Sequence, residues 1–449
     1  MKLNIHPDAV KNFNEQANAL LLELTTSPKS TEQKSAATFK PDIFVAAHLT
    51  EKDIIGEIRV GMVDGFGNEV AKLFDAGNVL MGLKEDGFQK LMRLSESMQR
   101  TKPLSDKVSV RFITDLIFEW VKNKYKNTTD LSMTDFVLRK CEEGLKEIEI
   151  WIPIALLLIQ SEIKLGKIIF KTISKELIDS WSTAWQANNP EHSDKVKQSF
   201  DKKRNKIQGH AASTIKLCAE PARAYEIAQE ETERAISLLR VFSSAFIFPR
   251  VVSYCAMLGR ENIESKLYFT LDEGQLRGMS EGFVSSEFKP WLLDNSFLSK
   301  IKPSLDILDE ILMCKEMSDF QVTVLDSLSL YSKSALCKSV ADKLIYILIA
   351  LEHILLKNEN EPIMQNIGER IAFFISNKRE ERKQIIDRVK SIYALRSKFI
   401  HHGQSIDDMK TMERFMFDAW LFFQSLISNV NRFKTKEQFI TKLEEVKLS

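Results

Sequence analysis

The C-terminal part of the chain constrains the fold most, because from residue 304 onward apolar residues recur at the spacing of an α-helix. The segments that show this pattern are 304–316, 319–357, 363–376, 380–402 and 407–433. Pro303 stands where a helix can begin, since the first helical turn makes no use of the N–H that proline lacks. The breaks at 358–362 and 403–406 are short, which favours antiparallel packing of neighbouring helices. The sequence therefore predicts an all-α helical bundle over residues 302–449.

Residues 145–301 combine two kinds of pattern and predict an α+β domain with short strands. Runs of β-branched residues alternate with polar ones, and this alternation is typical of strands. The predicted strands are 148–158, 163–173 and 266–271. Helical spacing covers 176–186 and 194–245 instead.

Residues 1–144 predict a helical N-terminal region. A short amphipathic helix fits 1–23, and the Ser/Thr/Lys-rich stretch 25–39 predicts a flexible segment. Farther along, residues such as Leu73 and Phe74 recur at helical spacing between glycines, which predicts short helices. The fold class expected for the whole chain is therefore α+β, mostly helical.

The composition is that of an ordinary globular chain of 449 residues, with 63 Lys+Arg, 62 Asp+Glu and a formal net charge of +1. This balance excludes a globally basic nucleic-acid coat protein but leaves room for a local basic surface. The five cysteines are widely spaced, which argues against disulfides and thiolate zinc sites and favours a reducing compartment. No signal peptide is recognisable, and no apolar run reaches the ~20 residues that a membrane span needs. We therefore expect a cytoplasmic protein without a membrane partner.

Nucleotide-binding and metal-binding motifs are absent or incomplete. The chain has no P-loop and no H-E-x-x-H pattern, so we expect no cofactor and no metal site. The fragment Gly65-Phe66-Gly67 lacks the third glycine of a dinucleotide fingerprint and predicts a plain turn. Residues 278–282 match G-x-S-x-G but lack the flanking strand and helix that a nucleophile elbow requires.

The strongest local feature is the stretch 392–403, with the sequence IYALRSKFIHHG. Gly403 stands where helices commonly end in the left-handed conformation. Arg396 precedes His401 by five residues, which on a helix means about 7.5 Å of rise and about 140° of rotation. A long arginine side chain can share a surface with a histidine at that separation.

An arginine and a histidine on one surface can cleave RNA without a metal. The imidazole takes the proton of the 2′-hydroxyl or protonates the leaving oxygen, and the guanidinium holds the phosphate as it gains negative charge. The helix is also basic, since residues 378–398 carry eight cationic and three acidic side chains. The predicted RNA-binding residues are Lys378, Arg379, Arg382, Lys383, Lys390 and Lys398. A solvated helix face is the alternative explanation of this charge.

Spacing alone does not identify such a site. Arg204 and His210 repeat an Arg-to-His spacing of six residues in another basic stretch, where a glycine interrupts the helix, and we interpret that pair as a coincidence. Glu352 follows an apolar run in which an unpaired carboxylate would be costly. It either supports the motif helix by pairing with Arg396 or Arg370, or it orients the catalytic groups.

The chain from about 325 to 425 resembles the Apea-like branch of the HEPN superfamily. The similar elements are Ala350-Leu351-Glu352, Arg370-Ile371-Ala372 and the run LRSKFIHHG at 395–403. The family motif is an arginine, a polar residue and, a few positions later, a histidine. Arg396, Ser397 and His401 match it, and His402 matches the longer spacing. The resemblance implies a helical bundle that forms a homodimer with the two Arg/His motifs facing each other.

The resemblance also implies a metal-independent endoribonuclease, often with an antiviral defence or toxin-like role; attack by the 2′-hydroxyl would leave 2′,3′-cyclic phosphate ends. The catalytic residues would be Arg396, Ser397, His401, His402 and Glu352, with either histidine able to serve. The partners would be RNA and a second copy of the chain, while the N-terminal region would sense a phage or host trigger molecule. The alternative is a non-catalytic HEPN dimerisation or interaction module whose function resides in the N-terminal α+β region.

Overall fold

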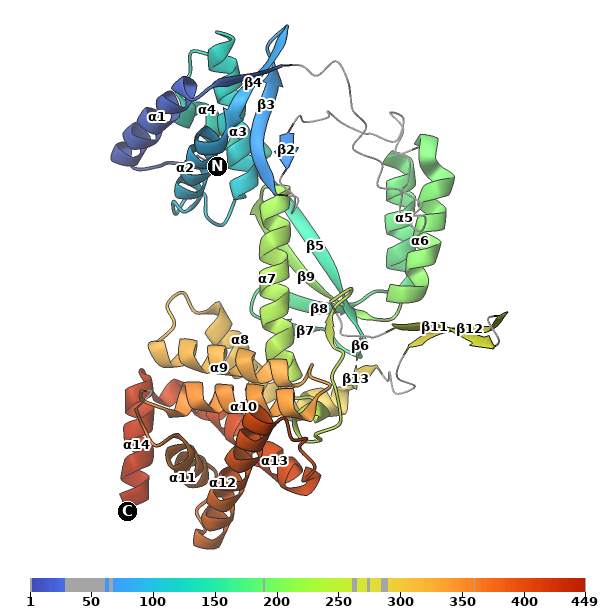
Figure 1. The fold of residues 1–449 in the computed structure, drawn as a ribbon, viewed down its shortest axis with the longest axis vertical. Coiled ribbons are helices and arrows are strands. Elements are labelled where there is room, and N and C mark those ends of the chain that lie inside the picture. Colours follow the sequence, from blue (N-terminus) through green and yellow to red (C-terminus); the bar gives the residue numbers. More distant parts are fainter. Residues whose placement is uncertain are drawn as a thin grey trace. The chain divides into compact units, whose positions relative to one another are not determined.

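The computed structural model shows an α+β protein that is mostly helical (Figure 1). It describes residues 2–28, 61–63, 68–188, 190–260, 265–272, 275–283, 290–358 and 360–448. The chain forms two compact units: unit 1 is Met1–Ile148 with Lys216–Ile227, and unit 2 is Glu149–Ile215 with Ala228–Ser449. The boundary expected at 144/145 falls close to the first division. The boundary expected at 301/302 falls inside unit 2, and the chain returns to unit 1 at a point that sequence patterns do not mark.

Unit 1 packs helices against a small antiparallel sheet. Its helices are α1 (Pro7–Leu22), α2 (Glu85–Gln99), α3 (Val110–Tyr125) and α4 (Met133–Gly144). Its strands are β1 (Thr25–Pro28), β2 (Gly61–Val63), β3 (Glu69–Asp75) and β4 (Val79–Lys84), in the order β1-β4-β3-β2. Apolar side chains from all four helices, with the fully buried Trp120 among them, form one core.

Two expectations for this region are wrong. Leu73 and Phe74 belong to strand β3, not to a short helix. Four successive residues of β3 are buried, so the sequence lacks the alternation that normally reveals a strand. The start of the segment expected to be flexible is strand β1, in which Thr25 lies opposite Gly82 of β4. Residues 29–39 and the Gly65-Phe66-Gly67 fragment lie outside the residues that the structure describes.

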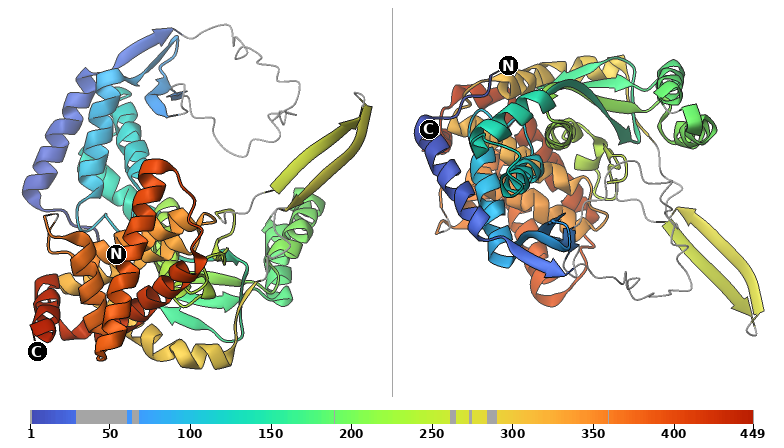
Figure 2. Two further views of the ribbon diagram at one scale, coloured as in Figure 1. Left: turned by 60° about the horizontal axis from the view of Figure 1, so that its bottom comes forward. Right: turned by 90° about the horizontal axis from the view of Figure 1, so that it is seen from above.

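The strands predicted in the middle of the chain are confirmed. The strands of this part are β5 (Lys146–Ala155), β6 (Leu157–Ile159), β7 (Ile163–Leu165), β8 (Ile168–Thr172), β9 (Ala211–Ala219), β10 (Ala256–Met257), β11 (Ser265–Asp272), β12 (Gln275–Phe283) and β13 (Trp291–Leu293). Five of them form a sheet in the order β10-β5-β9-β8-β7, and β13 pairs with β6 in parallel. Strands β11 and β12 form a two-stranded ribbon, yellow in Figure 2. The G-x-S-x-G match lies within β12, so it is strand and not the sharp turn of a nucleophile elbow.

The helix expected over 194–245 is interrupted. This stretch contains α6 (Ser193–Ile207), strand β9 and α7 (Pro221–Arg240). Helix α5 (Lys175–Asn188) precedes them. Gly209 has φ 81°, a value that L-residues other than glycine rarely adopt, and there the chain turns into β9. The first residues of β9 are buried and small, so their composition suited a helix while their pairing with β8 decides for a strand.

The C-terminal part of unit 2 is helical throughout the residues described between 302 and 448, orange to red in Figures 1 and 2. Its helices are α8 (Asn295–Met313), α9 (Asp319–Ser334), α10 (Val340–Leu355), α11 (Ile363–Ile375), α12 (Arg379–His402), α13 (Met409–Asn429) and α14 (Lys436–Leu448). Pro303 lies inside α8 and not at its start, because Asp294 caps that helix two turns earlier in the chain. The segment expected over 319–357 is two helices, and Ser339 caps the second.

Aromatic side chains fill this helical part. Tyr331 stacks on Phe423, with ring centroids 4.1 Å apart, and Phe422 is fully buried beside it. Trp420 is half-buried and stacks on Phe417 at 5.9 Å. No helix among the residues that the structure describes is long and apolar enough to cross a membrane.

Candidate functional site

The motif residues lie near the C-terminal end of α12. The helix ends as the sequence predicts: Gly403 has φ 62°, and its N–H donates to the carbonyl oxygen of Phe399 at 2.9 Å. Only a residue without a Cβ adopts this conformation at little cost. The inner face of α12 is buried and is formed by Ile385, Val389 and Ile392.

Arg396 lies on this inner face, one turn beyond Ile392. Its Nε atom is buried and has no hydrogen-bond partner among the residues that the structure describes. Leaving a buried donor unpaired costs about 1–3 kcal/mol, so folded proteins seldom keep one. The acceptor that suits a guanidinium best is an anionic oxygen, such as that of a phosphate.

Tyr393 lies one turn before Arg396 on α12 and is close enough for the charge of Arg396 to act on it. The hydroxyl of Tyr393 donates to Oε1 of Glu352 at 2.8 Å, which joins α12 to α10. Burial and the Glu352 carboxylate raise the pKa of Tyr393, and the positive charge of Arg396 opposes that rise. The partners expected for Glu352 were Arg396 and Arg370, and no hydrogen bond or ion pair of the described structure joins it to either. Tyr393 lies three residues before Arg396, and residues at that spacing are neighbours on a helix. This spacing is the feature of the sequence that indicates a place for Tyr393 near Arg396.

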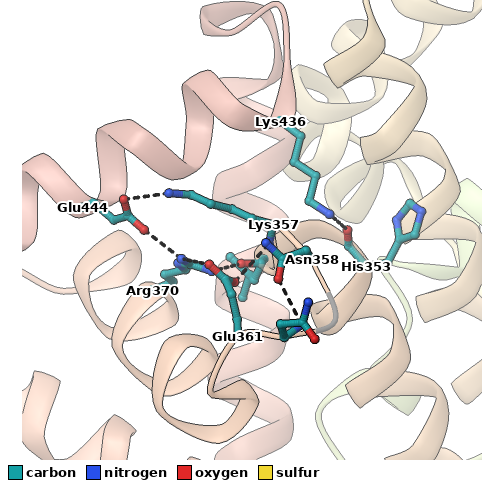
Figure 3. Close-up of polar contacts among 9 residues, drawn as sticks. His353, Lys357, Asn358, Glu361, Arg370, Lys436 and Glu444 are labelled. Atoms are coloured by element: carbon teal, nitrogen blue, oxygen red, sulfur yellow. Dashed lines mark hydrogen bonds and ion pairs between the residues drawn. The ribbon is translucent and has the colours of Figure 1, made fainter.

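Arg370 has a separate, structural task (Figure 3). Its guanidinium donates to both carboxylate oxygens of Glu361, at 2.7 and 2.9 Å, and to Glu444 at 2.8 Å. Lys357 reaches Glu444 as well, at 2.9 Å. The hydrogen bonds from Arg370 lower the pKa of Glu361 to about 2. This cluster ties the connection between α10 and α11 to helix α14.

His401 and His402 occupy the last turn of α12, and both are exposed. Their ring centroids lie 6.5 Å apart, with the ring planes at 64°. Ser397 is exposed as well. Arg396 and His401 stand about 140° apart around the helix, so the arginine belongs to the inner face and the histidine to the outer one. Within one chain the structure joins Tyr393 to Glu352 and places Arg396 one turn beyond Tyr393, and it leaves Ser397, His401 and His402 on the surface.

The outer face of α12 carries a row of polar and cationic residues. Steps of four or seven residues keep side chains on one side of a helix. The exposed residues so related are Arg379, Lys383, Lys390, Ser397 and His401, which we call the α12 outer face. A row of this kind places cationic groups along the approach to His401.

The six residues predicted to bind RNA differ in how free they are. Lys378 pairs with Glu381 at 2.8 Å, and Lys390 approaches Asp387 at 3.8 Å. Arg382 donates to the carbonyl of Ser376 at 2.7 Å and lies over the ring of Phe373. The remaining three, which are exposed and form no ion pair with a described residue, are Arg379, Lys383 and Lys398.

No family model, curated protein or solved structure matches this chain. The resemblance of residues 325–425 to the Apea-like HEPN branch therefore rests on the sequence alone, chiefly on residues 350–352, 370–372 and 395–403. Among the described residues, no group of three or more His, Cys, Asp and Glu side chains has the arrangement of a metal site.

Sequence patterns missed a pocket of about 690 Å³ between α12 and α13. Arg388 on one wall grips the carboxylate of Asp418 with two hydrogen bonds, at 2.6 and 3.0 Å. Burial raises the pKa of Asp418, and the guanidinium of Arg388 opposes the rise. Arg388 and Asp418 thus satisfy each other, and Lys410, Glu413 and Arg414 line the same pocket. Neither Arg396 nor His401 lines it.

Proposed function

We propose that the protein is a metal-independent endoribonuclease of the HEPN type, with Arg396 and His401 as its principal groups. The observation that carries the proposal is the buried Nε of Arg396, which has no acceptor in the described structure and lies one turn beyond Tyr393 on α12. A phosphate of the RNA backbone would supply that acceptor. The α12 outer face would guide the strand to the histidines, because its lysines and arginine attract phosphates.

The reaction follows from the groups present. An imidazole, that of His401 or His402, removes the proton of the 2′-hydroxyl as the 2′-oxygen bonds to phosphorus. The guanidinium of Arg396 stabilises the added negative charge on the non-bridging oxygens. The bond from phosphorus to the 5′-oxygen then breaks, and an imidazolium gives that oxygen its proton. The products are a 2′,3′-cyclic phosphate and a free 5′-hydroxyl.

A homodimer would complete the site. In one chain Arg396 and His401 lie on different faces of α12. A second copy packed at the end of this helix would bring its own Arg/His motif to the first, so that one histidine could act as the base and the other as the acid. Light scattering of the full-length protein at micromolar concentration should give the mass of a dimer. A monomer that still cleaves RNA would show that one chain is sufficient.

A second candidate function places the activity in the N-terminal region and leaves the helices for dimerisation. The observation that favours it is a polar pocket of about 450 Å³ in unit 1. Its buried Lys72 binds Glu69 at 3.0 Å and Asp115 at 2.8 Å, while Arg111 and Arg223 also line it. A pocket with such charges is also where a small trigger molecule of a defence system would bind. If the wild-type protein does not cleave RNA and a small ligand binds in this pocket, this candidate function is favoured.

The experiment that tests the ribonuclease proposal separates 2′-hydroxyl chemistry from other cleavage. Full-length protein is incubated in EDTA with labelled RNA, with DNA of the same sequence, and with RNA whose 2′-hydroxyls are methylated. Only the unmodified RNA should be cut, because the other two lack the attacking group. Product ends should carry the 2′,3′-cyclic phosphate. Cleavage of the DNA, or cleavage that EDTA abolishes, would overturn the proposal.

A further inference from the structure

Helix α6 presents an entire face to solvent. None of its residues is buried, and the half-buried residues Val196, Phe200 and Ile207 all fall on one side. Phe200 and Ile207 pack against a small core of Ile173, Ile178 and Ala212, which fixes this inner side. The opposite side of α6 contacts no apolar cluster of the described structure.

About 120° around the helix from the inner side lies a stripe of three lysines, Lys195, Lys202 and Lys206, which we call the α6 stripe. Steps of seven and four residues keep them within about 40° of one another around the helix and spread them over about 16 Å. All three are exposed, and none forms an ion pair with a residue that the structure describes. The acidic residues of α6, Asp194 and Asp201, lie about 100° away around the helix and do not neutralise the stripe.

The other basic residue of α6 behaves differently. Arg204 turns toward α5 and forms an ion pair with Asp179, which raises its own pKa and lowers that of Asp179. Arg204 therefore holds α6 to α5. The α6 stripe has no such role in the described structure.

The helix is held firmly enough to position the stripe. Helices α5 and α6 lie side by side in both figures (Figures 1 and 2), and Ser193 donates to Gln186 at 3.1 Å near their connection. At the other end, the N–H of Gly209 donates to the carbonyl of Ile173, and the N–H of Ile173 donates to the carbonyl of His210, both at 2.9 Å. The lysines thus stand on a pair of helices that are joined to each other at their connection and to Ile173 at the other end.

We propose that the α6 stripe is a contact surface for single-stranded RNA, separate from the α12 outer face. The proposal rests on the proposed function, since an endoribonuclease must hold its strand beyond the bond that it cleaves. Several phosphates fit along a stripe of this length, and unpaired lysines bind them by charge without reading sequence. Helix α5 adds Trp185, which is 57% exposed and offers a large ring on which a base can stack.

The test measures binding and not cleavage, so that it can fail independently of the ribonuclease proposal. The probe is a labelled single-stranded RNA with 2′-O-methyl groups, which cannot be cut by the proposed route. Fluorescence anisotropy in EDTA over a range of salt concentrations gives the dissociation constant and its salt dependence. The stripe variant is Lys195→Gln/Lys202→Gln/Lys206→Gln in the full-length protein. The matched control removes three lysines that already have acidic partners, the half-buried Lys140 and the exposed Lys302 and Lys442.

The stripe variant should bind at least about tenfold more weakly at low salt. The slope of the logarithm of the dissociation constant against the logarithm of the salt concentration should become smaller by about 2. Each phosphate that a lysine no longer neutralises reduces the magnitude of this slope by ~0.7. The control should bind like the wild type. Lys202→Gln alone should show about a third of the change in slope, which guards against loss of folding in the triple variant. Equal binding and equal slopes for the stripe and control variants would overturn the proposal.

Discussion

The hydroxyl of Tyr393 donates a hydrogen bond to the carboxylate of Glu352 at 2.8 Å, one helical turn before Arg396. This bond crosses from α12 to α10 and accounts for a carboxylate at the end of an apolar helix. It also sets the orientation of the part of α12 from which Arg396 extends. Glu352 is therefore a positioning residue in our account, and Arg396 is the group that meets the phosphate.

Tyr393→Phe tests this relationship. The variant leaves a half-buried carboxylate without its donor, which should lower the free energy of unfolding by about 1–3 kcal/mol. Urea denaturation of the wild type and the variant measures the change. Tyr346→Phe is the matched control, because Tyr346 lies half-buried on α10 and its hydroxyl has no partner among the described residues. Equal losses in the two variants would show that the Tyr393–Glu352 bond contributes nothing specific.

Arg396→Lys separates charge from geometry at the proposed phosphate site. A lysine keeps the positive charge but lacks the planar pair of donors that grips a phosphate, so cleavage should fall by at least about tenfold. Stability should change little or rise, because the variant removes a buried donor without a partner. Single-turnover cleavage of labelled RNA measures the first effect, and urea denaturation measures the second. A variant that cleaves at the wild-type rate would exclude bidentate binding by Arg396.

The pair of Arg370 and Glu361 should make stability depend on pH. The pKa of Glu361 is about 2 in the folded protein, against about 4.3 in an unfolded chain. A lowered pKa stabilises the fold above about pH 4–5, and the contribution disappears as the pH falls toward 2. Glu361→Gln should therefore be less stable than the wild type at pH 7, and the difference should shrink as the pH approaches 3.

Urea denaturation at both pH values measures this difference. Glu445→Gln serves as the control, because the ion pair of Glu445 with Lys442 lies on the surface, where such pairs contribute little. A stability difference for Glu361→Gln that stays constant with pH would contradict the account of this cluster.

Two glycines of the helical part should respond to alanine in opposite directions. Gly403 has φ 62° at the end of α12, where a Cβ is strained, so Gly403→Ala should destabilise the protein by about 1 kcal/mol. Gly368 lies inside α11 with ordinary space for a Cβ, the nearest atom being 3.5 Å away, so Gly368→Ala should stabilise by about 0.5–1 kcal/mol. Thermal melts of both variants give the signs, and equal signs would contradict the assigned conformations.

The helices were predictable from the sequence where their apolar residues form a clear stripe. Helix α12 shows this best, since Ile385, Val389 and Ile392 mark its buried face and Gly403 marks its end. Strand β3 was not predictable, because both of its faces are covered and its four buried residues follow one another. The prediction for strand β9 was wrong for another reason. Its small residues suit a helix locally, and only the pairing with β8 makes this segment a strand.

For the candidate site, sequence patterns pointed to Arg396 and the histidines but not to their surroundings. The spacing gave the angle of about 140° between Arg396 and His401. It could not tell which of the two faces inward, because that depends on the packing of α12 against the other helices. The partner of Glu352 was not predictable either, because the bond from Tyr393 depends on how α12 packs against α10.

The central claim is tested most directly by the cleavage of a labelled RNA in EDTA by the wild type, by His401→Ala and by His210→Ala. The account predicts that the wild type and His210→Ala cleave alike and leave 2′,3′-cyclic phosphate ends. It predicts that His401→Ala loses about 10²-fold or more of the rate, and that His402→Ala loses less. Cleavage by His401→Ala at the wild-type rate, or no cleavage by the wild type under any condition, would contradict it.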